Sequence, residues 1–273
     1  MNNTTPVTYV GPKMQILPSE LARYENGSWA AERKHDGHWC ELKTDARGHV
    51  KSLTSRSGSP MKADFQTTAS PNSTFIGELS YGTEAAVREG KVVLYVFDVA
   101  QLLGNDVTQM SYDQRRELLE CITFDDKCKL VEQRTADFQA FFSEINAAGG
   151  EGLVLKKRRK KFLRGKTDEW VRVKLFRYVD YIVMSVGKSD GGQPNLQIGL
   201  YDGNKLERVA TVKNLPKGFK FENVVGRVVE VKGLEVHASG ALRHGHFERF
   251  RDDKPTQDCT LSAALAIGGY KDC

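Results

Sequence analysis

Trp29-Ala30-Ala31-Glu32-Arg33-Lys34-His35-Asp36-Gly37 is a short, apolar-leaning run that ends at a turn residue. The run predicts a β-strand, and Gly37 predicts the turn that closes it. Lys34 would then stand at the mouth of a pocket rather than on an open face of the strand. The histidines beside it, His35 and His38, are expected to be wall or solvent residues. Because Lys-x-Asp-Gly alone is short enough to arise by chance, its meaning depends on the segments that follow.

The composition is that of an ordinary globular protein, with 273 residues of which 40% are hydrophobic and 27% charged. The mean hydropathy is −0.46. The longest apolar stretch, Val92 to Leu103, is interrupted by Asp98 and Gln101, so we expect no membrane span. The first residues lack the basic and apolar regions of a secretory signal.

The cysteines indicate a reducing compartment. They are five in number and contain no CxxC pair: Cys40, Cys121, Cys128, Cys259 and Cys273. An odd number without paired spacing favours free thiols over a disulfide framework or a zinc site. We therefore predict a cytoplasmic location.

The net charge of +5 is concentrated in one place, the basic tract Lys156–Lys166. The tract holds eight cations and no acid: Lys156, Lys157, Arg158, Arg159, Lys160, Lys161, Arg164 and Lys166. Without these eight charges the rest of the chain has a net charge of −3. Such a local patch suits a polyanionic partner. The alternative is a solvated loop without any partner.

The first part of the chain predicts strands and two helices. Residues 28–54 alternate apolar runs with turn residues in a β-meander pattern. Further strands are expected at Phe75–Ser80, Val92–Val99, Gly152–Lys156 and Trp170–Phe176. Ser111 is a capping residue ahead of helix formers. A second helix is expected over 136–148, with these apolar residues in the core: Phe138, Phe141, Phe142 and Ile145.

From Tyr178 onward the pattern changes to five short strands separated by turn signals. These strands are expected at Tyr181–Val186, Leu196–Tyr201, Leu206–Val212, Val224–Val231 and Phe247–Phe250. Five short strands in this space fit a small barrel such as the OB-fold. We predict an α+β fold of two domains, residues 1–178 and 179–273, with a hinge near Arg177–Asp180.

Six segments, in a fixed order, could supply the groups that phosphoryl chemistry needs: an amine, carboxylates, an aromatic face and cations. They are Lys34-His35-Asp36-Gly37, Ser55-Arg56-Ser57-Gly58, Gly77-Glu78-Leu79, Val96-Phe97-Asp98, Glu151 to Lys156, and Trp170 to Lys174. A lysine amine is protonated at neutral pH and must lose its proton to attack. Arg172, Lys174 and a metal ion on Glu151 are the cations that would lower the Lys34 pKa.

In this order the chain resembles the covalent nucleotidyltransferases, and among them the ATP-dependent DNA ligases. The likeness runs from Glu32 to Cys259, and the stretch Leu242–Pro255 is similar to the last ligase motif. The resemblance implies an antiparallel-sheet nucleotidyltransferase domain followed by a C-terminal OB-fold barrel. It also implies ATP and Mg²⁺ as cofactors.

The resemblance implies a role for each matching residue of the nucleotide pocket. Lys34 would form the lysine–AMP bond, and Glu32 would contact the adenine amino group, favouring ATP over GTP. Phe97 would stack on the purine. Glu78 and Arg56 would hold the ribose and the phosphate side.

The remaining roles concern charge. Glu151 would bind the divalent metal, while Arg172 and Lys174 would contact the AMP phosphate. Three residues of the second domain would close over ATP to orient the pyrophosphate, with help from two further arginines. These are Arg251, Asp253 and Lys254, and then Arg243 and Arg249.

The chain departs from the family pattern at four positions. Trp39 stands where the first motif often has arginine, so a ribose or 5′-phosphate interaction is missing or is supplied elsewhere. Arg172 replaces the usual lysine, and a forked donor differs from a point charge. In the last motif, His246 and Gly245 stand where arginine and proline, respectively, are common.

The implied activity is the sealing of nicked duplex DNA by a monomer without sequence preference. The tract residues expected to grip DNA phosphates are Lys157, Arg158, Arg159, Lys160, Lys161, Arg164 and Lys166. We expect no helical DNA-binding domain ahead of Lys34. Two alternatives stay open: an RNA ligase or capping-type relative, and a non-catalytic nucleic-acid-binding module.

Overall fold

The computed structural model describes residues 9–61, 65, 67–80, 92–174, 176–189 and 191–268. It divides into two compact units. The first comprises the described residues of Met1–Asn146 and Gly150–Lys174, and the second those of Ala147–Gly149 and Leu175–Cys273. The main division thus lies between residues 174 and 175.

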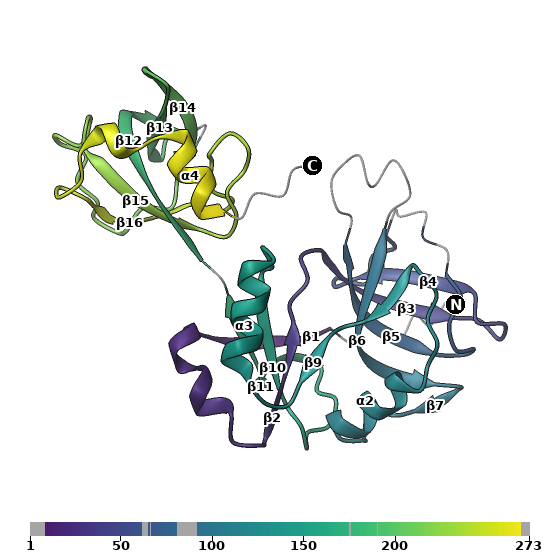
Figure 1. The fold of residues 1–273 in the computed structure, drawn as a ribbon. Helices are drawn as coiled ribbons and strands as arrows, with labels where there is room; N and C mark the ends of the chain where they lie inside the picture. Colours follow the sequence, from purple (N-terminus) through teal and green to yellow (C-terminus); the bar gives the residue numbers. More distant parts are fainter. Residues whose placement is uncertain are drawn as a thin grey trace. The chain divides into compact units, whose positions relative to one another are not determined.

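One sheet of the first unit joins segments from both ends of that unit, in the order β1-β11-β10-β2-β9 (Figure 1). Its strands are β1 (Val10–Ile16), β11 (Gly165–Lys174), β10 (Gly152–Lys157), β2 (Trp29–Arg33) and β9 (Gln133–Arg134). β1 pairs with β11 in parallel, whereas the other pairs are antiparallel. The strand that carries Glu32 therefore lies beside the strand that follows Glu151.

The second sheet of this unit has the order β4-β3-β5-β6-β7, and β8 pairs with β6 in parallel. Its strands are β4 (Val50–Ser55), β3 (His38–Thr44), β5 (Thr74–Ser80), β6 (Val93–Leu102), β7 (Asn105–Asp106) and β8 (Cys128–Leu130). Apolar side chains of these strands, among them Leu42, Phe75 and Leu94, form a buried cluster. Both sheets are mixed rather than purely antiparallel, which corrects the expected sheet type.

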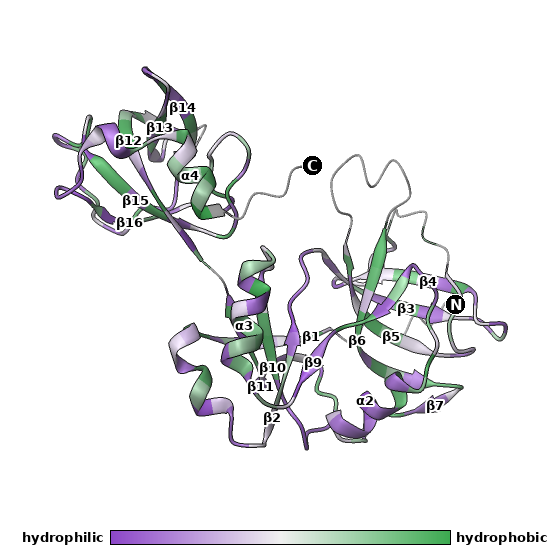
Figure 2. Ribbon diagram, viewed as in Figure 1, coloured by the Kyte–Doolittle hydropathy of each residue, from purple (hydrophilic) through white to green (hydrophobic). Residues whose placement is uncertain are grey.

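Both helices expected in this part of the chain are present, and α3 is a little shorter than the predicted 136–148. In α2 (Tyr112–Glu120) the Ser111 hydroxyl accepts from the Gln114 N–H, as a capping residue should. Figure 2 shows α2 mainly in purple, in keeping with its polar sequence. In α3 (Phe138–Ala147) the three phenylalanines and Ile145 are buried, as predicted. The 3₁₀ helix η1 (Pro18–Tyr24) was not predicted.

A buried ion pair joins α2 to the second sheet. Arg115 Nε and Nη2 donate to the two carboxylate oxygens of Asp98 at 2.7 and 2.9 Å. Both side chains are 1% exposed. Arg115 also donates to the Met110 and Lys160 carbonyls, at 2.8 and 3.4 Å. Its hydrogen-bonding capacity is used within the fold, so we assign Arg115 a structural role.

The second unit contains a five-stranded antiparallel sheet in the order β14-β13-β12-β15-β16. The elements are β12 (Arg177–Lys188), β13 (Pro194–Asp202), β14 (Lys205–Val212), β15 (Val228–Gly233), β16 (His246–Phe250), η2 (Thr256–Asp258) and α4 (Leu261–Gly268). A parallel bridge between Asn214 and His246 links the chain just after β14 to the start of β16. The two edges of this sheet therefore meet at one point. Figure 2 shows β15 in green, as expected of a core strand.

The strand predictions hold with shifted ends. The five strands expected after Tyr178 are present, but the fourth begins at Val228 rather than Val224. β11 begins at Gly165, before the expected Trp170, and ends at Lys174. The short strands β1, β7, β8 and β9 and the helix α4 were not predicted.

Four of the five cysteines lie among the described residues, and all four are free thiols, as predicted. Cys40, Cys128 and Cys259 are buried, whereas Cys121 is exposed. Burial raises the pKa of Cys128 to about 12, so its thiol stays protonated at neutral pH. In the described part of the chain no helix is both long and apolar enough to span a membrane.

The variant Arg115→Leu should lower the free energy of unfolding by about 3–5 kcal/mol, because it leaves the Asp98 carboxylate buried and unpaired. Chemical denaturation followed by far-UV circular dichroism measures this loss. Asp98→Leu/Arg115→Leu should recover much of it. The control Lys13→Leu breaks the exposed pair with Asp168 and should cost less than about 1 kcal/mol. An Arg115→Leu protein as stable as this control would contradict the assigned role.

Candidate active site

The alternation of side chains along three adjacent strands builds one wall of a pocket. Glu32 on β2 lies opposite Val154 on β10, and Val154 lies opposite Arg172 on β11. Lys156, two positions after Val154 on β10, lies opposite Trp170 on β11. Because every second side chain of a strand points to the same face, all five belong to one face of this sheet. All five line the same pocket.

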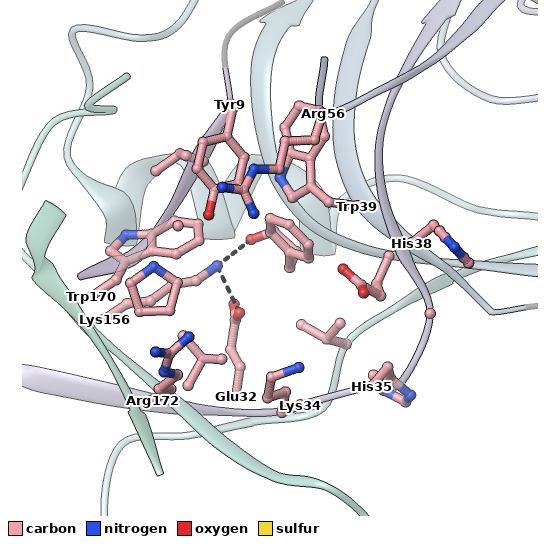
Figure 3. A pocket seen from close by; sticks show the side chains of 18 of the residues that line it. Tyr9, Glu32, Lys34, His35, His38, Trp39, Arg56, Lys156, Trp170 and Arg172 are labelled. Atoms are coloured by element: carbon pink, nitrogen blue, oxygen red, sulfur yellow. Dashed lines mark hydrogen bonds and ion pairs between the residues drawn. The ribbon is translucent and has the colours of Figure 1, made fainter. Parts of the chain in front are cut away.

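The second sheet supplies the other wall. Trp39 on β3 and Glu78 on β5 are direct cross-strand neighbours, and Phe97 comes from β6. Arg56 follows β4, and its guanidinium lies 4.1 Å from the centre of the Tyr9 ring. Together with the first wall they enclose a cavity of about 390 Å³, within the size range of small-ligand sites (Figure 3).

Lys34 stands at this cavity with its position fixed at both ends. Its backbone N–H donates to the Gly152 carbonyl at 2.9 Å. Its Nζ donates to Glu151 Oε2 at 2.6 Å. The other oxygen of Glu151 lies 3.3 Å from Lys174 Nζ. One carboxylate thus separates two lysines, and the nearest charged group to Lys34 is an acid rather than the expected cations.

A second lysine, Lys156, lines the cavity but is almost fully buried, with its side chain 1% exposed. Its Nζ lies 2.7 Å from Glu32 Oε2 and donates to the Phe97 carbonyl at 2.7 Å (Figure 3). It also lies 4.0 Å from the centre of the Trp170 ring, a cation–π contact. Burial lowers the Lys156 pKa, and the negative charges of Glu32 and Asp98 oppose that shift. Lys156 therefore cannot belong to an exposed basic surface.

Glu32 is held from both sides. The Tyr112 hydroxyl donates to its Oε1, and Lys156 pairs with its Oε2. The Gln133 side-chain amide donates to the Tyr112 hydroxyl at 2.8 Å. Burial and the Glu32 charge raise the Tyr112 pKa well above its ordinary value, so this hydroxyl stays a donor. The Glu32 carboxylate, 2% exposed, therefore keeps one orientation in the pocket.

Glu78 has an unusual protonation equilibrium. Burial raises its pKa to about 7, the negative charges of Glu151 and Asp36 add to the rise, and Lys34 opposes it. Near neutral pH the Glu78 side chain therefore populates both its protonated and its ionised form. A carboxyl in this state both donates and accepts hydrogen bonds.

His35 is a wall residue, as predicted. Its ring stacks on Tyr95 with the centroids 3.5 Å apart. Burial, together with the charges of Arg33 and Lys34, lowers its pKa to about 4. The imidazole is therefore neutral at physiological pH and adds no charge beside Lys34.

The basic tract is fixed to the first turn of α2. The Tyr112 and Asp113 N–H groups donate to the Lys160 and Arg158 carbonyls at 2.8 and 3.0 Å. The Asp113 carboxylate also pairs with the Arg158 side chain at 3.1 Å. Both Lys157 and Lys160 pair with one acid, Glu169, at 3.0 and 3.4 Å. The tract cations exposed to solvent are Arg159, Lys160, Lys161, Arg164 and Lys166.

In the second unit, the candidate residues form a charge cluster of their own. Lys254 Nζ lies 2.7 Å from Asp180 Oδ2, and Arg251 Nη1 lies 3.4 Å from both Asp180 and Glu230. The Arg251 guanidinium donates to Asp253 at 2.8 and 2.9 Å. This contact lowers the pKa of the Asp253 carboxyl to about 2. Both cations are thus held by acids of the same unit.

Comparison with known families agrees with this set of groups. Residues 63–174 match the sequence model described as "ATP dependent DNA ligase domain". This part of the chain is therefore similar to the ATP-dependent DNA ligases.

Curated relatives of this chain carry ligase names. "DNA ligase 2" of Korarchaeum cryptofilum is 25% identical over 253 residues, which covers 70% of this chain and 42% of that protein. "DNA ligase" of Enterobacteria phage T3 is 31% identical over 133 residues, covering 42% of this chain and 38% of that protein. The chain thus spans less than half the length of these relatives.

Two solved structures have a fold similar to that of this chain. One comes from a structure–function study of Lig E DNA ligases described as DNA binding with a minimal scaffold. It has a TM-score of 0.59 at 20% identity and covers 82% of this chain and 93% of that one. A second, Pmar-Lig_PreS3, has a TM-score of 0.59 at 16% identity and covers 87% of this chain and 67% of that one.

Most residues predicted for the nucleotide site lie together in the first unit. The pocket itself is lined by Glu32, Lys34, Arg56, Glu78, Phe97 and Arg172. Glu151 and Lys174 join them through the ion pairs with Lys34. Arg251, Asp253 and Lys254 lie in the second unit. The individual roles of these residues stay predictions.

Two residues of the site were not predicted from the sequence, and a third was assigned to the wrong surface. Tyr112 and Tyr9 both reach the site from outside the quoted motifs. Neither has a local signal, because each depends on which distant strands pair. Lys156 was grouped with the basic tract, but its side chain is 1% exposed and points inward. The alternation along β10 is the signal that could have separated it from Lys157.

The free energy of unfolding should depend on pH through the protonation of Glu78. Its pKa rises from 4.5 in the unfolded chain to about 7 in the fold, so the folded state binds the proton more tightly. The stability from this group is complete below pH 4.5 and is lost as the pH rises through 7. Glu78→Gln should abolish that fall, as measured by urea unfolding at several pH values. A carboxyl carbon resonance of Glu78 titrating near 4.5 would refute the prediction.

Proposed function

We propose that the chain is an ATP-dependent DNA ligase that seals nicks in duplex DNA through a lysine–AMP intermediate. The observation that carries this proposal is the position of the Lys34 amine, 2.6 Å from Glu151, in a cavity with aromatic and acidic walls. In the first step Lys34 Nζ forms a bond to the α-phosphorus of ATP, and the bond to pyrophosphate breaks. The proton on Nζ must leave, and Glu151 Oε2 is its nearest acceptor.

The base would bind between the two sheets. Phe97 and Trp170 supply aromatic surface, with their ring centroids 5.8 Å apart. The Glu32 carboxylate would accept from the adenine amino group, since Tyr112 and Lys156 hold it in one orientation. A guanine presents a carbonyl at that place, so this contact favours ATP over GTP.

The phosphates would meet the cations of the first sheet. Arg172 Nε is buried without an acceptor among the described residues, which leaves a donor for the α-phosphate. Lys174 stands beside Glu151, near the attacking amine. Glu78 and Arg56 would hold the ribose and the phosphate side from the second sheet.

The donor set fits Mg²⁺, which commonly binds one or two carboxylates together with substrate phosphates and water. Glu151 would hold the ion, and no group of three or more His, Cys, Asp or Glu side chains is placed for a metal among the described residues. When bound, Mg²⁺ supplies positive charge against the charge on the phosphate oxygens. A cation on Glu151 would also compete with Lys34 for that carboxylate.

The second unit is best explained as an OB-fold. Its strand order and the bridge between Asn214 and His246 suit a five-stranded, partly open barrel. Arg251, Asp253 and Lys254 would act on the pyrophosphate during the first step. To do so, Arg251 and Lys254 would exchange Asp180 for the phosphate oxygens.

The remaining two steps would use the nick. The AMP passes from Lys34 to the 5′-phosphate, and the 3′-hydroxyl then attacks that activated end and releases AMP. The exposed cations of the basic tract would bind phosphates of the duplex without reading its sequence. We further infer a monomer, and the free thiols support a cytoplasmic location.

Two other functions make different predictions. An RNA ligase or capping-type relative would prefer nicked RNA or GTP, so assays with nicked DNA, nicked RNA and both nucleotides distinguish it. A non-catalytic binding module would hold DNA without forming an adduct. The Glu32 position and the Arg251–Lys254 segment favour the DNA ligase.

Lys34→Ala should abolish transfer of label from α-³²P-ATP to the protein and all sealing that starts from ATP, because it removes the attacking amine. Binding to nicked duplex should be largely kept. The exposed Lys13→Ala is the matched control and should label normally. A wild-type protein that stays unlabelled with magnesium and ATP would contradict the proposed ligase function.

The triple variant Arg159→Ala/Arg164→Ala/Lys166→Ala should weaken binding to nicked duplex and leave adduct formation intact. The slope of log binding constant against log salt should fall by about 1 for each DNA phosphate that is no longer bound. Lys51→Ala/Lys127→Ala/Lys129→Ala removes the same charge from exposed sites outside the tract and serves as the control. Equal weakening in the two variants would indicate a general charge effect rather than direct binding by the tract.

A further inference from the structure

Trp39 carries a hydrogen-bond donor that the fold does not use. Its indole Nε1 is buried and has no acceptor among the described residues. Buried indole N–H groups normally have a partner, because an unpaired donor costs free energy. Trp39 lines the cavity in which the nucleotide would bind (Figure 3). The missing acceptor is therefore to be sought on a ligand.

The surroundings of Trp39 fix its ring. Tyr9 packs edge-on against it, with centroids 5.5 Å apart and an interplanar angle of 72°. Arg56 in turn covers the Tyr9 ring at 4.1 Å. On the neighbouring strand Glu78 lies directly opposite Trp39. A fixed N–H and a carboxyl that can donate or accept therefore stand side by side on one wall.

This pair of groups suits a sugar better than a phosphate or a base. The cations near Lys34, namely Arg172 and Lys174, lie on β11 in the first sheet and suit phosphate oxygens. Glu32 is in that sheet too. The indole N–H is a single, neutral donor without the charge of the arginine common at this position. Neighbouring hydroxyls, which each donate and accept, match one N–H beside one carboxyl.

We propose that the Trp39 indole N–H donates to a ribose hydroxyl of the bound nucleotide, beside Glu78, and so selects a ribonucleotide over its deoxy analogue. This inference rests on the proposed function, because it assigns a contact within the same nucleotide site. It makes Trp39 a specificity-determining residue that replaces the missing arginine with a different kind of contact. A deoxy analogue would leave the N–H buried and unpaired, which a site of this kind rejects.

Equilibrium binding without magnesium tests the contact, because no adduct forms in EDTA. ATP, 2′-deoxy-ATP and 3′-deoxy-ATP are titrated by calorimetry into the wild type and into Trp39→Phe, which keeps the ring against Tyr9. The wild type should bind ATP about 3–10-fold more tightly than the analogue that lacks the contacted hydroxyl. Trp39→Phe should lose most of that preference while binding the analogue as the wild type does.

Trp29→Phe is the matched control, since Trp29 starts the strand that carries Glu32 but does not line the cavity. It should keep the wild-type ratio. A second readout needs no variant: the indole ¹H–¹⁵N resonance of Trp39 should shift with ATP and much less with the analogue that lacks the contacted hydroxyl. This readout also decides the matter if Trp39→Phe fails to fold.

Two results would overturn the contact: an unchanged ratio in Trp39→Phe, or an equal loss of affinity for ATP and both analogues. The second result would place the N–H on a phosphate or in packing. The ligase proposal fails separately, by absence of the Lys34 adduct in magnesium, and that failure leaves the binding ratios interpretable.

Discussion

The constraint on which the site depends is the pairing of β10 with β2 on one side and β11 on the other. That pairing brings residues 32, 154 and 172, which are far apart in the sequence, into one row. Since side chains alternate along a strand, the same register that aims Glu32 and Arg172 at the cavity also turns Lys156 inward. A single hydrogen-bonding register thus places the acid, the cation and the buried lysine together.

The first unit holds two clusters of oppositely charged side chains at the cavity, one buried and one more exposed to solvent. In the wall of the cavity, Glu32 and Lys156 form a buried pair that Tyr112 completes. At the cavity, Lys34, Glu151 and Lys174 form a group with one cation in excess. This pair is almost fully buried and keeps Glu32 in one orientation at the cavity wall. The outer group is more accessible, so an incoming phosphate or cation could rearrange it at lower cost.

The sequence predicted what local signals encode. The α2 cap at Ser111 and the buried face of α3 follow from residues within a few positions of each other. The residues of the nucleotide pocket could be predicted because the six segments that carry them follow one another in the order typical of the DNA ligases. What could not be predicted depends on distant pairing: the orientation of Lys156, the reach of Tyr112 to Glu32, and the unpaired N–H of Trp39. The run Lys156–Lys161 reads as one patch until the register of β10 separates its first member.

The same register limits how this chain can vary in length. One residue inserted between Val154 and Lys156 would reverse the facing of every later side chain in β10, exchanging cavity for core. The strands of the second sheet carry the same constraint, because Trp39, Glu78 and Phe97 reach the cavity from β3, β5 and β6. Over evolutionary time, gain or loss of single residues should therefore accumulate in the connections between strands and be nearly excluded from 152–157.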